Sequence, residues 1–214
     1  MIKKEHILLT GCNGAGKTVQ GRMIAACMDR QYADMSRILK LGAAYDSNLA
    51  REFAAYSGTA DLVPNALIFQ PVETYMRTLR RGDHIVLSGI PRERDQADPL
   101  LEILATHLGT DSVAVVNMIL DADDAVKRCK QRAENDIAEG KEARPDDLDE
   151  AKIRKRIRLH EDENAPVLEK LREHGARIVE AKCLDRPQDT FIGILRALGV
   201  RRSDLFFIPE GFPA

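Results

Sequence analysis

Short apolar runs alternate with longer segments of mixed polar and apolar residues along the 214 positions of the chain. The runs at residues 6–10, 84–88 and 113–120 do not alternate polar with apolar positions, which is typical of parallel strands covered by helices on both faces. Weaker runs at 176–181 and 31–34 predict a fourth and a fifth strand. Helices are predicted at 17–29, 35–57 with a break around Gly42, 64–81, 96–107, 122–139, 147–173 and 188–198. This order predicts an α/β fold with a doubly wound parallel sheet, whose strands end at the edge where ligands bind.

Three segments depart from the alternation of strand and helix. Residues 34–63 have a helical pattern and no obvious strand of their own. Residues 133–145 are polar and have no apolar stripe. A polar segment of this kind is either a mobile cover over a site or a solvated helix end and loop, and local sequence leaves both open. The tail at 200–214 carries Phe206 and Phe207, which could pack on the domain or contact a second subunit.

Composition places the chain among folded globular proteins, since 44% of its residues are hydrophobic and its net charge is only −2. That charge gives no bulk attraction for a long nucleic acid. The four cysteines are scattered without a C-x-x-C pair, which predicts free thiols in a cytoplasmic protein and no structural zinc. The amino-terminal apolar run is too short for a signal peptide, and no run reaches the roughly 20 residues of a membrane span.

The strongest chemical motif is the segment from Gly11 to Thr18, which reads G-x-x-x-x-G-K-T between a predicted strand and a predicted helix. Glycines at these positions allow consecutive N–H groups to point at one anion, and the helix amino terminus adds positive potential. Lys17 can then reach the terminal phosphates, and Thr18 is positioned to bind Mg²⁺. A structural glycine turn is the alternative interpretation, and this loop alone does not identify what receives the phosphate.

An arginine follows the strand at 84–88, in the segment Gly89-Ile90-Pro91-Arg92. Its guanidinium would lie at the ligand edge of the sheet, where it can bind two phosphate oxygens at once. Gln96, four residues later, could hydrogen-bond the edge of a base. A single Gly-x-Pro-Arg turn is a weak signal, because most arginines at strand ends are surface residues.

Several further motifs follow in chain order: Leu62-Val63-Pro64-Asn65, Arg128 and Arg132 one helical turn apart, the stretch 144–157 with Arg144 and Arg156, and Arg186-Pro187. With the phosphate loop and Arg92, these motifs resemble those of the nucleoside monophosphate kinases over about residues 5–199. Within that family they are most similar to adenylate kinases with a short lid. The number of motifs, found in the family's order, makes the resemblance specific.

The resemblance implies a P-loop NTPase-like three-layer fold with a five-stranded parallel sheet in a kinase domain at 1–199. A helical insertion at about 34–63 would bind the monophosphate, a short lid would lie at about 133–143, and 200–214 would be a separate tail. The implied reaction is reversible transfer of the ATP γ-phosphoryl group to AMP, assisted by Mg²⁺. The implied partners are these nucleotides, without long nucleic acid or membrane. We expect a monomer, although the tail could mediate a dimer.

The family's site residues map onto this chain position by position. The implied catalytic cations are Lys17, Arg92, Arg132, Arg144 and Arg156. The implied ATP-binding residues are Gly11, Asn13, Gly14, Ala15, Gly16, Lys17, Thr18, Val19, Arg128, Arg132 and Arg186. The implied monophosphate-binding residues are Met35, Lys40, Leu62, Val63, Gly89, Arg92, Gln96, Arg144 and Arg156. The metal would be near Thr18 and Ser88.

Four of these positions depart from the family's usual residues. Ser88 stands where an aspartate near Mg²⁺ is usual, and Thr18 where a glycine follows the lysine. Lys40 stands where an arginine is usual and cannot form the bidentate fork, and Met35 replaces a small or hydroxyl residue. These departures keep two alternatives open: a nucleotide-binding protein with weak or no catalysis, and a kinase for another nucleotide or small metabolite.

Two further residues on the predicted helix 147–173 receive a structural interpretation. Asp147 and Glu150 have the spacing of a helix cap and its partner. His160 is interpreted as a packing or surface histidine rather than a catalytic base.

Overall fold

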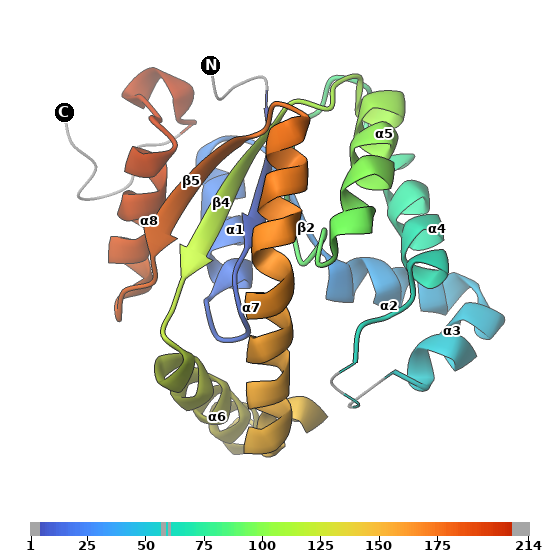
Figure 1. The fold of residues 1–214 in the computed structure, drawn as a ribbon, viewed down its shortest axis with the longest axis vertical. Coiled ribbons are helices and arrows are strands. Elements are labelled where there is room, and N and C mark those ends of the chain that lie inside the picture. Colours follow the sequence, from blue (N-terminus) through green and yellow to red (C-terminus); the bar gives the residue numbers. More distant parts are fainter. Residues whose placement is uncertain (1–4, 57–58, 60, 207–214) are drawn as a thin grey trace.

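The computed structural model describes residues 5–56, 59 and 61–206. In this part of the chain, parallel strands form one sheet in the order β2-β3-β1-β4-β5 (Figure 1). Their bounds are β1 His6–Thr10, β2 Gln31–Asp34, β3 Ile85–Ser88, β4 Val113–Ile119 and β5 Arg177–Lys182. The expected five-stranded parallel sheet of an α/β fold is therefore confirmed.

Helices connect the strands and account for most of the remaining described chain. The α-helices are α1 Lys17–Cys27, α2 Met35–Tyr45, α3 Ser47–Ala54, α4 Asn65–Met76, α5 Ala97–Leu108, α6 Ala122–Ala138, α7 Glu150–Glu173 and α8 Pro187–Ala197. Short 3₁₀ helices are η2 Arg94–Gln96, η3 Pro145–Leu148 and η4 Arg202–Asp204. Among the described residues, no helix combines the length and apolarity needed to cross a bilayer.

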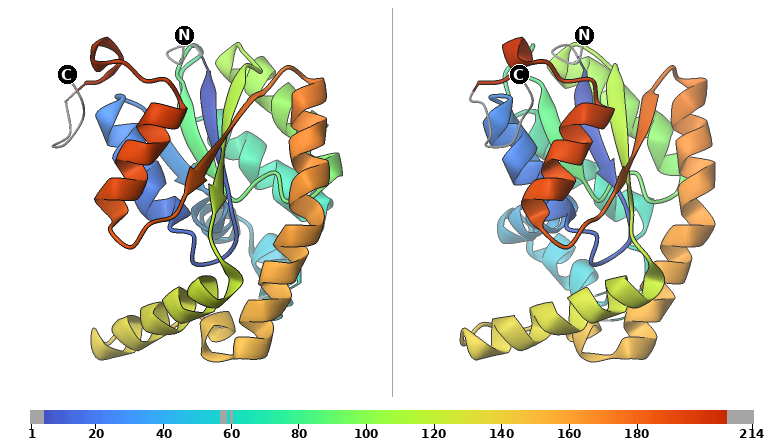
Figure 2. Two further views of the ribbon diagram at one scale, coloured as in Figure 1. Left: turned by 60° about the vertical axis from the view of Figure 1, so that its left-hand side comes forward. Right: turned by 90° about the vertical axis from the view of Figure 1, so that its left-hand side faces the viewer.

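The sheet has a buried cluster on each face, which explains why its central strands β3, β1 and β4 are mostly apolar. Ile7 and Leu9 of β1 pack on one side with α1 and α8, whereas Leu8 packs on the other side with α5 and the carboxyl-terminal half of α7. The two views of Figure 2 show these helices on opposite faces of the sheet. Successive residues of one strand thus enter different cores, as expected of a three-layer fold.

Helix boundaries depend on capping side chains, and two expectations about them were wrong. The break in the segment 35–57 lies at Asp46 rather than around Gly42, because the Asp46 carboxylate accepts hydrogen bonds from Asn48 N and Leu49 N and starts α3. The cap of α7 is Asp149, which accepts from Ala151 N and Lys152 N. Asp147 is therefore not the capping residue.

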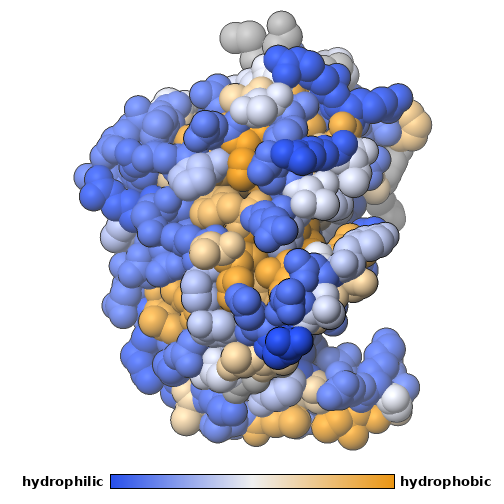
Figure 3. Space-filling model, turned by 90° about the vertical axis from the view of Figure 1, so that its right-hand side faces the viewer, coloured by the Kyte–Doolittle hydropathy of each residue, from blue (hydrophilic) through white to orange (hydrophobic). Residues whose placement is uncertain are grey.

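The carboxyl ends of the strands face a lobe made by α6 and the beginning of α7. Both helices extend beyond the sheet at the lower end of the molecule (Figure 2). The space-filling view shows apolar side chains gathered down the middle of one face, and a hollow between the main body and this lower lobe (Figure 3). The expected lid at 133–143 begins within α6, which ends at Ala138, and its role stays a prediction.

Candidate functional site

The phosphate loop lies between β1 and α1 and has the backbone geometry that its glycines predict. Gly14 and Gly16 have φ angles of 85° and 84°, and Gly16 immediately precedes the first helical residue, Lys17. A Cβ atom at Gly14 would lie 2.8 Å from Ala125 O, whereas one at Gly16 would meet nothing within 4 Å. Gly14 is therefore required for space as well as for backbone conformation, and Gly16 for conformation alone.

This difference predicts unequal effects of two matched substitutions. Gly16→Ala is expected to lower the free energy of unfolding by about 1 kcal/mol, which is the strain of a left-handed alanine. Gly14→Ala adds a clash with the α6 backbone, and we expect a loss of about 2–4 kcal/mol. Urea denaturation of both variants measures the difference, and equal losses would contradict the geometry.

The Lys17 side chain turns back onto the backbone of its own loop. Its Nζ donates hydrogen bonds to Gly11 O and, at 2.8 Å, to Cys12 O. Desolvation inside the loop, followed by the nearby Arg92, lowers the pKa of Lys17 to about 8. An arriving phosphate would replace these carbonyl partners and restore a full charge on the ammonium group.

Two cavities meet beside this loop. The first is lined by Gly11, Asn13 and Lys17 from the loop and by His160 and Asn164 from α7. The second is lined by residues of α2 and the start of α4, among them Met35, Leu39 and Ile68. Both cavities are bordered by Asp61, Leu62, Gly89, Arg92 and Arg156. Arg92 and Arg156 are thus placed between a phosphate-binding loop and a chamber lined by both apolar and polar side chains.

Arg92 is the central cation of this shared boundary. Its Nε donates to Gly89 O at 3.0 Å, and its backbone N–H donates to Gln96 Oε1 at 2.8 Å. Desolvation in the cleft, with the charges of Arg156 and Arg144 nearby, lowers the pKa of Arg92 to about 10. Several like charges held together in this way favour binding of a polyanion.

Acidic residues orient two of the other predicted arginines. Arg132 makes a bidentate contact with Asp147, with Nε–Oδ2 and Nη2–Oδ1 distances of 2.8 and 2.9 Å. Arg156 Nη2 lies 2.8 Å from Oδ2 of Asp146. Both carboxylates are buried, which fixes the guanidinium planes against the lower lobe. Asp147 therefore serves as an arginine partner, in place of the capping role expected from sequence.

The remaining predicted ATP-binding residues, and Arg144 from the acceptor side, differ in exposure. Arg128 Nη2 donates to Leu184 O at 3.0 Å, and Arg186 precedes α8 with an exposed side chain. Arg144 is exposed at the start of η3. Ala15 is buried and its carbonyl accepts from Cys183 Sγ, while Val19 is exposed on α1. Arg128 and Arg132 thus contact different protein partners in this ligand-free structure.

The acceptor-side predictions divide into two groups. Met35, Leu62, Val63, Gly89 and Gln96 all line the second cavity. Lys40 is exposed on α2, and Leu39 is the residue of that turn that lines the cavity. Lys40 therefore does not line the second cavity, unlike the other predicted acceptor-side residues of this paragraph.

Gln96 is buried and already hydrogen-bonded. Its Nε2 donates to Asn65 Oδ1 at 2.9 Å and to Glu93 Oε2 at 3.0 Å, and its Oε1 accepts from Arg92 N. Both amide hydrogens are therefore in use, and the free capacity of the side chain is one lone pair on Oε1. In this arrangement Gln96 can accept from a base but cannot also donate to it.

Of the two predicted metal-binding positions, Ser88 contacts a residue that the sequence did not single out, since Tyr32 Oη lies 2.8 Å from Ser88 Oγ. Thr18 and Ser88 both carry hydroxyl groups. These are neutral oxygen donors, and Mg²⁺ typically keeps several waters and binds chiefly through substrate phosphates. The donor set fits an ion that arrives with a nucleotide.

His160 is a second residue whose position beside the loop was not singled out in the sequence analysis. It lines the loop cavity, and burial, followed by the charges of Lys17 and Arg92, lowers its pKa to about 4. Position 160 is one turn beyond Arg156 on the same helix, so the helical spacing from that arginine was the available signal. Tyr32 had no comparable signal, because its partners are distant in sequence.

Comparison with curated proteins gives relatives that extend over most of the chain. The chain is 28% identical over 194 residues to an adenylate kinase of Mycobacterium tuberculosis, covering 91% of the chain and 99% of the relative. An adenylate kinase of Nocardia farcinica is 27% identical over the same shares. An adenylate kinase of Maricaulis maris is 27% identical over 172 residues, covering 79% of the chain and 86% of the relative. No protein-family model matches the chain.

Proposed function

The chain is an adenylate kinase-like phosphotransferase, and we propose that it transfers the γ-phosphoryl group of ATP reversibly to a nucleoside monophosphate, with AMP as the acceptor. The observation that carries this proposal is the pair of cavities that share Arg92 and Arg156. A phosphate loop borders one cavity and apolar side chains border the other. A donor triphosphate and an acceptor base therefore have separate chambers, with cations between them.

Phosphoryl transfer requires positioning and charge neutralisation more than covalent chemistry by the protein. Lys17 would bind the donor phosphates, and Arg92 and Arg156 would hold the transferred group between donor and acceptor. Arg132 and Arg144 would complete the ring of cations from the lower lobe when it approaches the loop. Closure of this lobe and of the α2–α3 segment would exclude water and limit hydrolysis of ATP.

Mg²⁺ bound to the ATP phosphates would neutralise charge that develops during transfer. Thr18 is the residue best placed to contribute a ligand, since it follows Lys17 in the first turn of α1. Ser88 supplies an oxygen without a negative charge. The chain's own residues would thus orient the nucleotide–metal complex and add little charge to it.

AMP is proposed as acceptor because the second cavity combines apolar side chains with polar groups, among them Gln96 Oε1, which keeps one free lone pair. The exocyclic amine of adenine is a donor suited to that lone pair. Met35 and Leu39 add apolar surface for the face of the base. Cytosine also carries an amine, so CMP is the closest competitor on these grounds.

A panel of acceptors tests the function. We expect ADP to form from MgATP and AMP, with lower kcat/KM for CMP, UMP and GMP, measured by separating the products. Preference for CMP, UMP or GMP would remove the AMP assignment but keep the phosphotransferase. Failure of all monophosphates, with active protein shown by ATP binding, would contradict the proposed function.

One observation favours the alternative of a nucleotide-binding protein with weak catalysis. Ser88 is neutral and its hydroxyl is bound to Tyr32, so no carboxylate is available at that position. Tight binding of a linked ATP–AMP analogue with negligible turnover is the result that this alternative predicts. Faster turnover in Ser88→Asp would support it further.

The four cysteines lie in the described part of the chain and form no disulfide there, and three of them are buried, which fits a protein that works in a reducing cytoplasm. We propose that location and a monomeric state. Leu205 packs on the core cluster beside α1 and α8, and Phe206 N donates to Cys27 O, so this part of the tail folds back on its own domain. The rest of the tail, including Phe207, lies outside the described residues.

A further inference from the structure

One side of α7 contributes a row of polar side chains to the cavity beside the phosphate loop. Arg156, His160 and Asn164 are spaced four residues apart, so each stands on a successive turn of the helix. All three line the cavity, together with Lys17 from the loop. The proposed phosphoryl transfer uses Arg156 and Lys17, and it gives the other two residues of the row no role.

The two ends of this row are held by other side chains, whereas its middle member is not. Asn164 Oδ1 accepts from Thr10 Oγ1 at 3.0 Å, and Arg156 Nη2 lies 2.8 Å from Asp146 Oδ2. No hydrogen bond or ion pair joins the His160 ring to another residue in the described part of the chain. The ring therefore borders the cavity with its nitrogens available to a ligand.

The charges that share the cavity with the His160 ring are chiefly positive. Lys17 of the loop and Arg92 after β3 line the same cavity, and Arg156 lies one turn earlier on α7. Burial is the largest cause that lowers the pKa of His160 to about 4, followed by the charges of Lys17 and Arg92. Because an ordinary histidine has a pKa near 6.5, this ring is neutral at pH 7.

The acidic groups near the ring do not offset these cations. Asp61 lines the same cavity, but its Oδ1 lies 2.6 Å from Lys155 Nζ. The Cys12 thiol also lines the cavity, and burial raises its pKa, so it brings no negative charge. Glu161, the next residue on α7, is exposed. Negative charge that pairs with the ring must therefore come from a ligand.

A bound triphosphate supplies that charge, because a negative group close to an imidazole favours its protonated form. We propose that His160 is a phosphate-binding residue that takes up a proton from solvent when the triphosphate of a nucleotide enters the loop cavity. Both ring nitrogens are then donors, and the site gains a cation only in the bound state. The neutral ring of the free protein adds no repulsion to the neighbouring cations. This inference rests on the proposed use of ATP.

Proton uptake makes nucleotide affinity depend on pH with a definite sign. A group whose pKa rises on binding strengthens binding as the pH falls through its bound-state pKa. If the bound ring returns to its ordinary pKa of about 6.5, its contribution to affinity should be about fourfold larger at pH 6 than at pH 8. Lys17 has a pKa of about 8, so its own uptake occurs at higher pH than that of the ring.

The test is calorimetry of a non-hydrolysable ATP analogue with Mg²⁺ at pH 6, in two buffers of different ionisation enthalpy and without acceptor. The unmodified protein should take up about 0.5 proton or more beyond the uptake of His160→Gln. Lys17 and the nucleotide titrate in both proteins, so the difference reports the ring. His174→Gln is the matched control, because His174 follows α7 at its far end and contacts Asp98 Oδ1 at 2.7 Å. Its uptake should equal that of the unmodified protein.

An NMR titration of the histidine ring signals in the unmodified protein provides the same test without a substitution. With the analogue bound, the pKa of His160 should rise to about 6.5 or above, while that of His6 at the other end of the strands should stay unchanged. Equal proton uptake in the unmodified protein and His160→Gln, with binding retained, would overturn this inference alone. No binding of the analogue to the unmodified protein would overturn it together with the proposed function.

Discussion

Replacement of Arg92 by methionine is expected to lower kcat for phosphoryl transfer by about 10³-fold or more, the range found when a cation at the transferred group is lost. Arg92 borders both cavities, so its guanidinium is the group best placed to contact donor and acceptor phosphates together. Its removal would leave Arg156 and Lys17 to oppose the repulsion between two nucleotides. Steady-state rates with saturating MgATP and AMP measure the effect.

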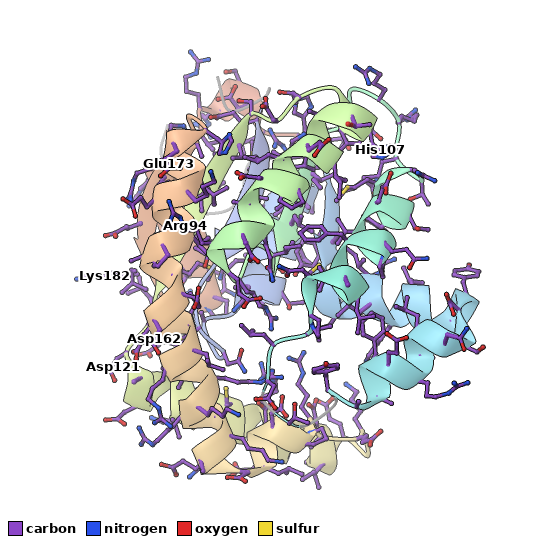
Figure 4. The ribbon with its side chains drawn as sticks, turned by 45° about the vertical axis from the view of Figure 1, so that its right-hand side comes forward. Arg94, His107, Asp121, Asp162, Glu173 and Lys182 are labelled. Atoms are coloured by element: carbon purple, nitrogen blue, oxygen red, sulfur yellow. The ribbon has the colours of Figure 1, made fainter. Side chains whose placement is uncertain are left out.

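Two further variants separate charge from geometry. Arg92→Lys keeps the charge but cannot form a bidentate contact, so its kcat should fall between those of methionine and arginine. Arg94→Met is the matched control, because Arg94 is exposed and its Nη2 lies 3.3 Å from Glu173 Oε1 on α7 (Figure 4). We expect it to retain nearly full activity. A comparable loss in Arg94→Met, or a near-normal rate in Arg92→Met, would contradict the assignment.

The sheet was predictable from sequence because strand burial is a local property. The three central strands β3, β1 and β4 are mostly apolar on both faces, as in the run Ile7-Leu8-Leu9, whose side chains enter opposite clusters. Even the weak run at Gln31–Asp34 is a strand, where it forms the edge beside β3. The order of the strands follows from right-handed crossovers once the helices between them are recognised.

Helix ends were less predictable because several residues compete to cap them. Asp46 ends α2 through its backbone N–H, which donates to Gly42 O, and begins α3 through its side chain, whereas Gly42 remains helical inside α2. Near α7, both Asp147 and Asp149 could have capped the helix. The choice depends on Arg132, which binds Asp147 from α6 and leaves Asp149 for the cap. A contact between residues distant in sequence therefore decides a local feature.

The candidate site shows the same division between local and long-range information. The phosphate loop is contiguous, so residue types and spacing predicted its conformation. The Tyr32–Ser88 contact joins two strands, and its geometry depends on the absence of a side chain at Gly21. The exposure of Lys40 depends on the rotation of α2, which places Leu39 at the cavity instead. Sequence alone gives no measure of that rotation.

A buried histidine at the opposite edge of the sheet controls stability in acid. His6 is fully buried at the start of β1, where Nδ1 accepts from Ile85 N at 3.3 Å and Nε2 contacts Thr110 O at 3.1 Å. This arrangement requires the neutral ring with its proton on Nε2. The pKa of His6 is lowered from 6.5 to about 4, and burial is the largest cause. The hydrogen bond to Thr110 O and the charge of Asp111 raise this pKa, but they only partly offset the burial. The positive charges of His84 and Arg30 lower it further.

We therefore expect the free energy of unfolding to rise with pH between about 4 and 6.5 and to level off above that range. In this interval the unfolded chain binds protons at His6 and His160 that the folded protein does not bind. For His6 the difference between the unfolded pKa of 6.5 and the folded pKa of about 4 corresponds to about 3 kcal/mol of unfolding free energy lost on full acidification.

His6→Gln keeps an acceptor and a donor but cannot titrate. The slope of its unfolding free energy against pH should therefore be lower by about 1.4 kcal/mol per pH unit. Urea denaturation across this range measures the slopes, and His160→Gln should reduce the slope additively, since the two residues lie at opposite ends of the strands. An unchanged slope in His6→Gln would show that the ring is not held neutral in the folded protein.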